Sequence, residues 1–190
     1  MRPVRHPSIS VSCLMLPTNC RSLALAAVIA AIPTNLVMAA DPTIVATTNF
    51  GFIDTSGEVK DQHAEHAKRL KRLDATVRNA LSTTDDIEVA PLACEGARCT
   101  ASAVGLETLS LEARKAGANY LLIGEVRKMS TLIGGLKFAV LDLTTNKPTC
   151  DRFLSYRGDT DESWQRAAIY AASEIKTHCL PNVVTKDVQD

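Results

Sequence analysis

Two successive strand–helix–strand units follow the first forty residues of this sequence. Residues Thr43 to Ile53 are rich in β-branched and aromatic side chains and predict a strand. Apolar residues at helical spacing from Gln62 to Leu81 predict an amphipathic helix, and Asp86 to Leu92 predicts the next strand. A second helix over Leu106 to Ala116 leads into Asn119 to Val126, the most apolar strand. Because crossovers between strands of one sheet are right-handed, the two units predict three parallel strands.

Short turns connect the remaining elements. The pair Gly134-Gly135 predicts a hairpin that leads into a fourth strand, Leu136 to Leu143. A turn over Thr144 to Pro148 precedes a fifth strand, Thr149 to Arg157. A last helix is expected from Asp161 to His178. The order β-α-β-α-β-β-β-α predicts an α/β fold, in which the helices pack on a single mixed sheet.

Residues 1–40 have the features of an export signal. Three arginines flank the amino-terminal side of Leu23–Ile32, a run of ten apolar residues, and small residues around Ala40 indicate a cleavage site. As a helix this run would span about 15 Å, half of the roughly 30 Å hydrocarbon core, so we expect no membrane anchor. Met15 is an alternative start, and a buried amino-terminal helix is the alternative interpretation. Cleavage would leave one globular domain, residues 41–181, and a polar tail, residues 182–190.

Composition excludes two classes of protein. The 190 residues include 21 basic and 21 acidic ones and are 46% hydrophobic, which excludes a disordered polar chain. Loss of the three early arginines would leave 18 basic residues against 21 acidic ones, a net charge of −3. Without a basic excess to neutralise phosphates, we expect no nucleic-acid partner.

Four cysteines remain after the signal, and an even set is typical of disulfides in an oxidising compartment. Three pairings are possible, and geometry selects one. The strand that begins near Cys150 rises about 23 Å, and the last helix rises about 28 Å. A helix that returns antiparallel to this strand therefore brings Cys179 back to Cys150. Cys94 and Cys99 are then expected to form a small structural disulfide, since a redox pair is typically C-x-x-C.

The predicted topology brings several loops to one edge of the sheet. The carboxyl ends of parallel strands meet there, and ligands of open α/β sheets bind at such ends. We call this the strand-end edge, and we expect the loop that carries Cys94 and Cys99 to reach it. Its expected binding residues are Asp54, Glu58, His63, His66, Lys128, Ser130, Arg157, Asp159, Asp161 and Trp164.

Two histidines on the first helix have a structural and a chemical interpretation. His63 and His66 share one face and continue its apolar stripe, so they are expected to form the polar end of the packed face. The alternative is a metal site completed by Asp54 or Glu58, as in a metal-dependent hydrolase. A zinc site would need further ligands, and the sequence has no H-E-x-x-H motif.

The segment before the last helix also has alternatives. Asp159 is expected to cap the helix, with Glu162 completing a capping box. A calcium site that uses Asp159, Asp161 and Asp54 is the alternative, although no glycine-punctuated calcium loop is present. Trp164 is expected to pack in the core rather than anchor a partner. Ser130 and Lys128 could imitate a Ser–Lys dyad, but their spacing gives this little support.

Several blocks of the mature sequence resemble an uncharacterised family of predicted secreted bacterial proteins, a domain of unknown function. The blocks cover nearly all of the mature chain in order, and they are Asp54–Glu58 (DTSGE), Ala64–Leu70, Ala116–Leu122, Lys128–Ile133 and Arg157–Trp164. More distantly, the pattern is similar to the amino-terminal domain of the periplasmic protein TolB and to related envelope accessory domains. That resemblance implies a non-enzymatic interaction module. The sequence lacks the propeller repeats of TolB, so the role of TolB itself does not carry over, and only its fold does.

The sequence therefore favours an exported binding or accessory module, periplasmic or secreted, that acts on a protein or another envelope component through the strand-end edge. No nucleophile-elbow or phosphate-loop pattern is present, so we expect no enzyme activity and no metal or cofactor. The alternatives are a metal-dependent hydrolase that uses His63 and His66, and a small-molecule sensor. An enzyme requires a pocket where these groups converge, whereas a binding module requires an exposed patch.

The export signal makes a direct prediction. Protein recovered from the periplasm of the producing cell should begin at Ala40 or Asp41, because the small residues there match a signal-peptidase site. Amino-terminal sequencing measures this. Periplasmic protein that still begins at Met1 or Met15 would contradict the prediction.

Overall fold

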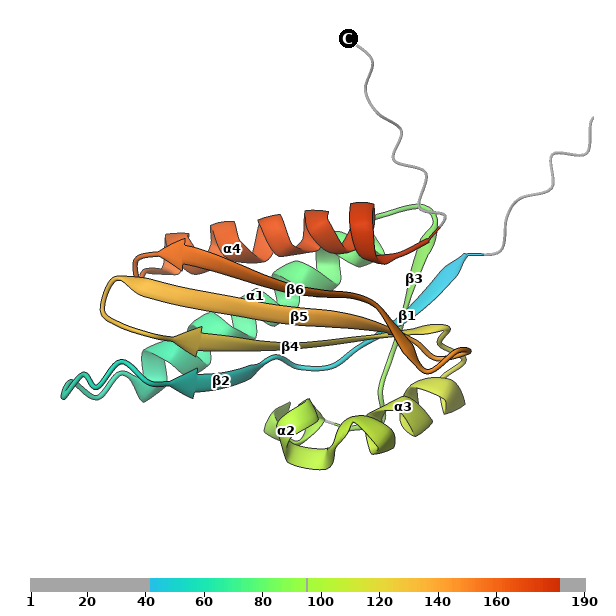
Figure 1. Ribbon diagram of the computed structural model, residues 1–190, viewed down its shortest axis with the longest axis horizontal. Helices are drawn as coiled ribbons and strands as arrows, with labels where there is room; N and C mark the ends of the chain where they lie inside the picture. The colour runs from blue at the N-terminus through green and yellow to red at the C-terminus, as the bar shows by residue number, and fades with distance from the viewer. Residues whose placement is uncertain (1–41, 95, 182–190) are drawn as a thin grey trace, which may run out of the picture. The chain divides into compact units, whose positions relative to one another are not determined.

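The computed structural model describes residues 42–94 and 96–181. These residues form one mixed sheet of six strands with helices packed against it, which confirms the predicted α/β fold (Figure 1). The predicted export signal and polar tail lie outside the described residues. Within them, no helix is both long and apolar enough to cross a membrane.

The sheet begins with parallel strands and ends with an antiparallel meander. Its strands are β1 (Thr43–Thr47), β2 (Gly51–Asp54), β3 (Ile87–Ala90), β4 (Tyr120–Lys128), β5 (Ile133–Asp142) and β6 (Lys147–Arg157). Five of them follow the order β3-β1-β4-β5-β6, and β2 also pairs with β4. Both β3 and β4 are parallel to β1, as the two crossover units predict. The β4–β5 and β5–β6 pairs are antiparallel.

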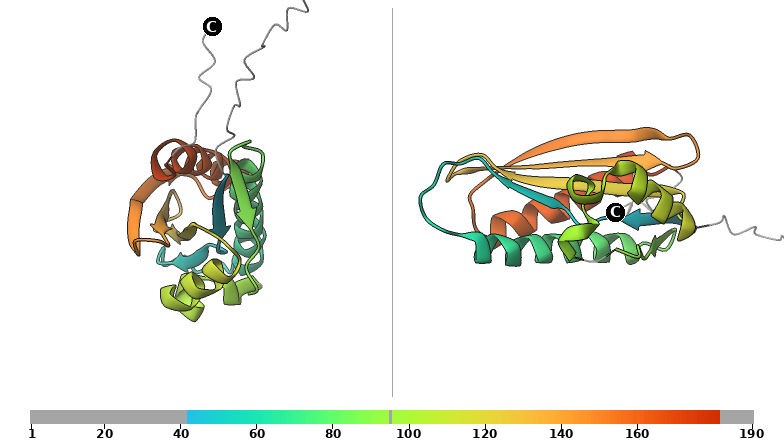
Figure 2. Two further views of the ribbon diagram at one scale, coloured as in Figure 1. Left: turned by 90° about the vertical axis from the view of Figure 1, so that its right-hand side faces the viewer. Right: turned by 90° about the horizontal axis from the view of Figure 1, so that it is seen from below.

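Helices cover both faces of the sheet. They are α1 (His63–Ser82), η1 (Gly96–Cys99), α2 (Ala101–Val104), α3 (Leu106–Lys115), α4 (Asp161–Glu174) and η2 (Ile175–Cys179). Helices α1 and α4 bury Leu73, Val77 and the alanines of α4 against one face, whereas α3 buries Leu109 against the other (Figures 1 and 2). Successive residues of β4 pack alternately on the two faces of the sheet, Leu121 on the α3 side and Leu122 on the side of α1 and α4. The reason is that successive side chains of a strand point to opposite faces.

The predicted first strand is interrupted, which corrects its expected span of Thr43 to Ile53. Thr47 lies opposite Leu122 and Gly51 opposite Glu125, so three residues between β1 and β2 face two residues of β4. This is the count of a β-bulge. The buried Phe50 of the bulge lies over Gly124, where an added Cβ would sit 2.1 Å from its ring. Only glycine fits beneath this ring.

Side chains of α1 hold the bulge in place. The carboxylate of Asp74 accepts a hydrogen bond of 2.9 Å from the Phe50 amide. Arg78 donates to the hydroxyl of Thr47 at 2.9 Å and to the side-chain oxygen of Asn49 at 3.1 Å. Burial raises the pKa of Asp74 to about 6, although the Phe50 hydrogen bond and the Arg78 charge oppose this rise.

Three local predictions are corrected by the packing. Gly134 and Gly135 lie inside β5 and not in a turn, because the rings of Tyr156 and Phe153 occupy the space that their side chains would fill. Helix α2 and the turn η1 were not predicted, since their four-residue lengths are too short to show a helical period. The last helix is regular to Glu174 and continues as one π-helical turn, η2.

Both expected disulfides are present. Cys150 in β6 joins Cys179 at the end of η2, with the two Cα atoms 5.2 Å apart. Cys94 joins Cys99 across 5.1 Å. The first link confirms that α4 returns antiparallel to β6. In the chain-entropy model, this link restricts the unfolded chain by about 3.5 kcal/mol.

The buried carboxylate of Asp74 predicts a pH-dependent stability. Because its folded pKa of about 6 exceeds the ordinary value of 3.8, its contribution is present below pH 4 and is lost as the pH rises through 6. We expect Asp74→Asn to keep an acceptor for the Phe50 amide and to remove this loss, about 3 kcal/mol. Urea unfolding of both proteins at pH 4 and pH 7 measures it. A difference in stability that does not change with pH would contradict the prediction.

Candidate functional site

A buried lysine lies at the centre of the strand-end edge. Lys128 is the last residue of β4, and its side chain is 3% exposed. Its ammonium group forms an ion pair with Glu58 and a hydrogen bond to Gln62. It also lies 3.4 Å from the carboxylate of Asp159 and 3.9 Å from that of Asp54. Burial lowers the pKa of Lys128, but the hydrogen bond to Glu58 and the surrounding carboxylates outweigh this and raise it.

Asp159 joins α1, α4 and β4 through one carboxylate. Its oxygens accept hydrogen bonds from His66 Nε2 at 2.8 Å, from Arg69 at 3.0 Å and from Trp164 Nε1 at 2.9 Å. Burial raises the pKa of Asp159, but the bonds from His66 and Trp164 and the charge of Arg69 outweigh it and lower the pKa. The carboxylate is therefore ionised at neutral pH.

An aromatic layer lies beneath these charges. The His66 ring is 4.8 Å from the Phe52 ring and 6.0 Å from the Trp164 ring, with which it is stacked. Tyr156 meets Trp164 edge-on at 6.3 Å. Both His66 and Trp164 are buried, so the core position predicted for Trp164 is confirmed. The strand-end edge is therefore held both by ring contacts of Phe52, His66 and Trp164 and by the ion pairs of Lys128.

The cap of α4 differs from the sequence prediction. Thr160 and Ser163 form the capping box, in which the Thr160 hydroxyl accepts from the Ser163 amide. Asp159 and Glu162 therefore do not cap the helix, because Asp159 is directed to His66, Arg69 and Lys128, and Glu162 pairs with Arg166. A hydroxyl cap serves the helix amides, so the Asp159 carboxylate remains available to His66 and Lys128.

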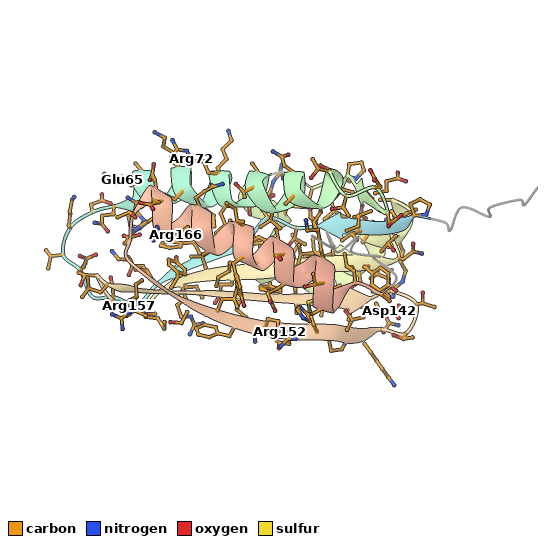
Figure 3. The ribbon with its side chains drawn as sticks, turned by 90° about the horizontal axis from the view of Figure 1, so that it is seen from above. Glu65, Arg72, Asp142, Arg152, Arg157 and Arg166 are labelled. Atoms are coloured by element: carbon orange, nitrogen blue, oxygen red, sulfur yellow. A yellow bond between two sulfur atoms is a disulfide. The ribbon has the colours of Figure 1, made fainter. Side chains whose placement is uncertain are left out.

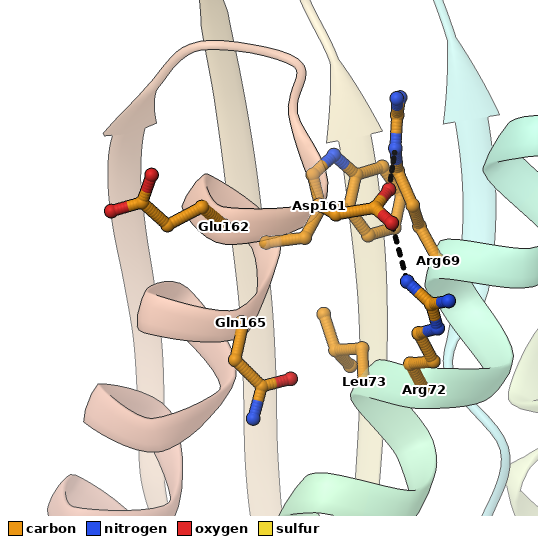
Figure 4. A pocket seen from close by; sticks show the side chains of 7 residues that line it. Arg69, Arg72, Leu73, Asp161, Glu162 and Gln165 are labelled. Atoms are coloured by element: carbon orange, nitrogen blue, oxygen red, sulfur yellow. Dashed lines mark hydrogen bonds and ion pairs between the residues drawn. The ribbon is translucent and has the colours of Figure 1, made fainter.

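Two arginines of α1 hold Asp161 from the same side. Arg69 donates to Asp161 at 2.9 Å, and Arg72 forms a second ion pair with it (Figure 4). These two hydrogen bonds lower the pKa of Asp161. A pocket of about 270 Å³ lies beside them, between Leu73 of α1 and Gln165 of α4.

Other predicted site residues lie apart from this cluster. His63 is exposed, and Ser130 accepts hydrogen bonds from the amides of its own turn, at Leu132 and Ile133. Arg157 is exposed on the far side of α4 from Arg72 (Figure 3). The polar face predicted for the two histidines is thus correct for His66 alone.

The metal-site and dyad alternatives gain no support from this geometry. Asp159 and Asp161 are paired with arginines, and His66 with Asp159, whereas His63 is exposed. In residues 42–94 and 96–181, no group of three His, Cys, Asp or Glu side chains is arranged to hold a metal. Lys128 bonds to Glu58 and Gln62 instead of Ser130.

The disulfide loop does not reach the predicted edge. The carbonyl of Cys99 accepts a hydrogen bond of 2.8 Å from the Asn49 amide, and the Gly96 carbonyl accepts one from the Asn49 side chain. The loop therefore lies beside the bulge, several residues before Asp54. The reason is that β3 is short and, among the described strands, pairs with β1 alone, while β2 and β4 continue beyond it.

The sequence prediction missed the exposed apolar residues of this edge. Val59 is fully exposed in the β2–α1 loop, and Leu132 is 69% exposed in the β4–β5 turn. The Leu132 carbonyl accepts from the Gly158 amide, which ties this turn to the β6–α4 turn. For Val59 the only sequence signal is a single apolar residue between Glu58 and Lys60, whereas Leu132 stands next to the apolar Ile133, the first residue of β5. The prediction also missed Arg69, which lies three residues after His66 on the same helix face.

The fold and this edge define a small α/β protein with a charged loop cluster whose ionised groups pair with one another. Residues 43–175 match the family model DUF3280, described as a protein of unknown function (DUF2380). The chain belongs to this family, which confirms the resemblance to an uncharacterised family. A comparison with curated proteins gave no match.

Several solved structures are similar to the chain. The PelC dodecamer from Paraburkholderia phytofirmans is 14% identical, with a TM-score of 0.43, over 71% of this chain and 89% of that one. Lipoprotein GNA1162 from Neisseria meningitidis is 14% identical, with a TM-score of 0.45, over 70% and 95%. TolB from Acinetobacter baumannii is 12% identical, with a TM-score of 0.41, over 71% and 29%.

The Lys128 network predicts a large loss of stability on one substitution. Lys128→Met removes the buried cation and leaves the carboxylates of Glu58 and Asp159 facing each other, so we expect a loss of about 3 kcal/mol. Arg127→Met is the control, because its exposed pair with Glu125 is worth less than about 1 kcal/mol. Urea unfolding measures both. Equal losses in the two variants would contradict the prediction.

Proposed function

We propose that the protein is a non-catalytic accessory module of the bacterial envelope, periplasmic or secreted, which binds a partner protein through the strand-end edge. The observation that carries the proposal is the pairing of two features. The exposed apolar side chains of Val59 and Leu132 stand on loops that the buried Lys128 network fixes in place. Exposed apolar side chains on a rigid base favour protein binding, since little conformational entropy is lost on association.

The charge arrangement supports binding in preference to catalysis. A general base needs a lone pair directed at a substrate, but the carboxylates of Asp159 and Asp161 accept bonds from protein donors. Lys128 is held as an ammonium by its acidic neighbours. These groups stabilise the loops, and the chemistry that they offer to a partner is an edge of paired charges around two apolar contacts.

The compartment follows from the cysteines. The four cysteines of the described residues form two disulfides, which are typical of proteins outside the cytoplasm. We further propose that residues 1–40 act as an export signal and that the protein is periplasmic or secreted. An envelope partner is consistent with both.

Site-specific photo-crosslinking in the producing cell tests the proposal. A photoreactive residue at Val59 or Leu132 should give a discrete adduct with a partner protein, because these side chains would be buried in the complex. The same residue at Leu111, an exposed position on α3, is the control and should give no adduct. Adding Leu132→Asp to the Val59 probe should reduce its adduct at least tenfold. Equal labelling from Val59 and Leu111, or none from Val59 and Leu132, would contradict the proposal.

A further inference from the structure

One edge of β2 has no neighbouring strand among the described residues. Strand β3 pairs with β1 from Ile87 to Ala90, where β3 ends. The chain then continues through Pro91 to the disulfide loop. Strand β2 continues the line of β1 but pairs only with β4 in the described part of the chain (Figure 1). The place that a longer β3 would occupy next to β2 therefore holds no strand from residues 42–94 or 96–181.

The free backbone groups of β2 point toward this position. The Thr55 amide donates to the Lys128 carbonyl at 2.8 Å, so residues 51, 53 and 55 direct their backbone groups to β4. Because the direction alternates along a strand, the N–H and C=O groups of Phe52 and Asp54 point to the opposite side. The two amides before them on that side are already bonded, Asn49 to Cys99 and Phe50 to Asp74. The free edge thus begins at Phe52.

A groove of about 830 Å³ lies beside the start of this edge, where Gly51 and Phe52 line it. Its α1 wall presents Ala67, Lys71 and Ala75 at successive helical turns, and all three are exposed. Its opposite wall includes Ser102 and Ala103 of α2. The small side chains leave room for a backbone to approach. Among the described residues Lys71 has no ion-pair partner, so the groove offers an unpaired cation.

We infer that an extended segment of another protein binds in this groove and adds a strand to the sheet at β2. Phe52 in the groove and Asp54, two residues further along β2, present donors and acceptors at strand spacing, and an extended polypeptide supplies the matching set. Lys71 favours an acidic side chain in that segment, and the alanines of α1 favour small or β-branched ones. This surface is separate from Val59 and Leu132, so the inference does not depend on the proposed function.

Peptide selection with the oxidised, processed protein tests the inference. A displayed library of random ten-residue peptides is selected against the wild type, and the best binder is synthesised. Ala67→Arg should weaken its binding at least tenfold, because the longer side chain fills the groove. Ala93→Arg, the same change at an exposed alanine outside the groove, should leave binding within twofold.

Two readouts distinguish strand addition from other modes of binding. Hydrogen exchange at the Phe52 amide should be fast in the free protein and at least tenfold slower with bound peptide. N-methylation of alternate peptide residues should abolish binding in one register and spare it in the other. No binder in the library, or a binder that leaves Phe52 exchange unchanged, would overturn the inference.

Two further outcomes would overturn it in favour of a different occupant. Phe52 exchange that is already slow in the free protein at every concentration would place a segment of the same chain in the groove. Exchange that slows as protein concentration rises would place a second copy there.

Discussion

One buried ammonium group organises the strand-end edge. Lys128 enters the interior from the last residue of β4, and carboxylates from the β2–α1 loop and the β6–α4 turn surround it. A lysine in this position is stable only if its charge is balanced, because removing an unpaired charge from water costs several kcal/mol. The end of β4, the β2–α1 loop and the β6–α4 turn are therefore held together because the charge of Lys128 must be neutralised. Asp159 extends it to α1 and α4 through His66, Arg69 and Trp164.

A second polar cluster, at the β-bulge, stabilises the chain through hydrogen bonds rather than through charge neutralisation. Asp74 and Arg78 satisfy backbone and side-chain groups that the bulge leaves unpaired, and this burial raises the pKa of Asp74. The pKa of Asp159 is lowered, because its hydrogen bonds from His66 and Trp164 and the charge of Arg69 outweigh its burial. The two carboxylates thus respond to pH in opposite directions. Pairing with β3 ends before the bulge, at Ala46 and Ala90, so in the described part of the chain the edge of β2 on that side has no strand partner.

Spacing along the chain predicted much of the fold but little of the site. The two crossover units indicated the parallel strands, and the matched lengths of β6 and α4 predicted the Cys150–Cys179 disulfide. Ten residues were placed at the strand-end edge, and hydrogen bonds or ion pairs join seven of them. Six are linked to one another or to Arg69, namely Asp54, Glu58, His66, Lys128, Asp159 and Asp161. Trp164 adds a hydrogen bond to Asp159. His63, Ser130 and Arg157 face elsewhere, because residues near the end of an element are brought together by topology but directed by their own turns.

The sequence by itself determined the order of the longer helices and strands, the parallel start of the sheet and the pairing of the cysteines. These follow from periodicity and chain length, which are local properties. Only the tertiary structure decided that Lys128 is buried, that Thr160 and not Asp159 caps α4, and that the first strand breaks at a bulge over Gly124. Each of these depends on groups distant in sequence that compete for the same partner or the same space. No pattern within one segment records the outcome of such a competition.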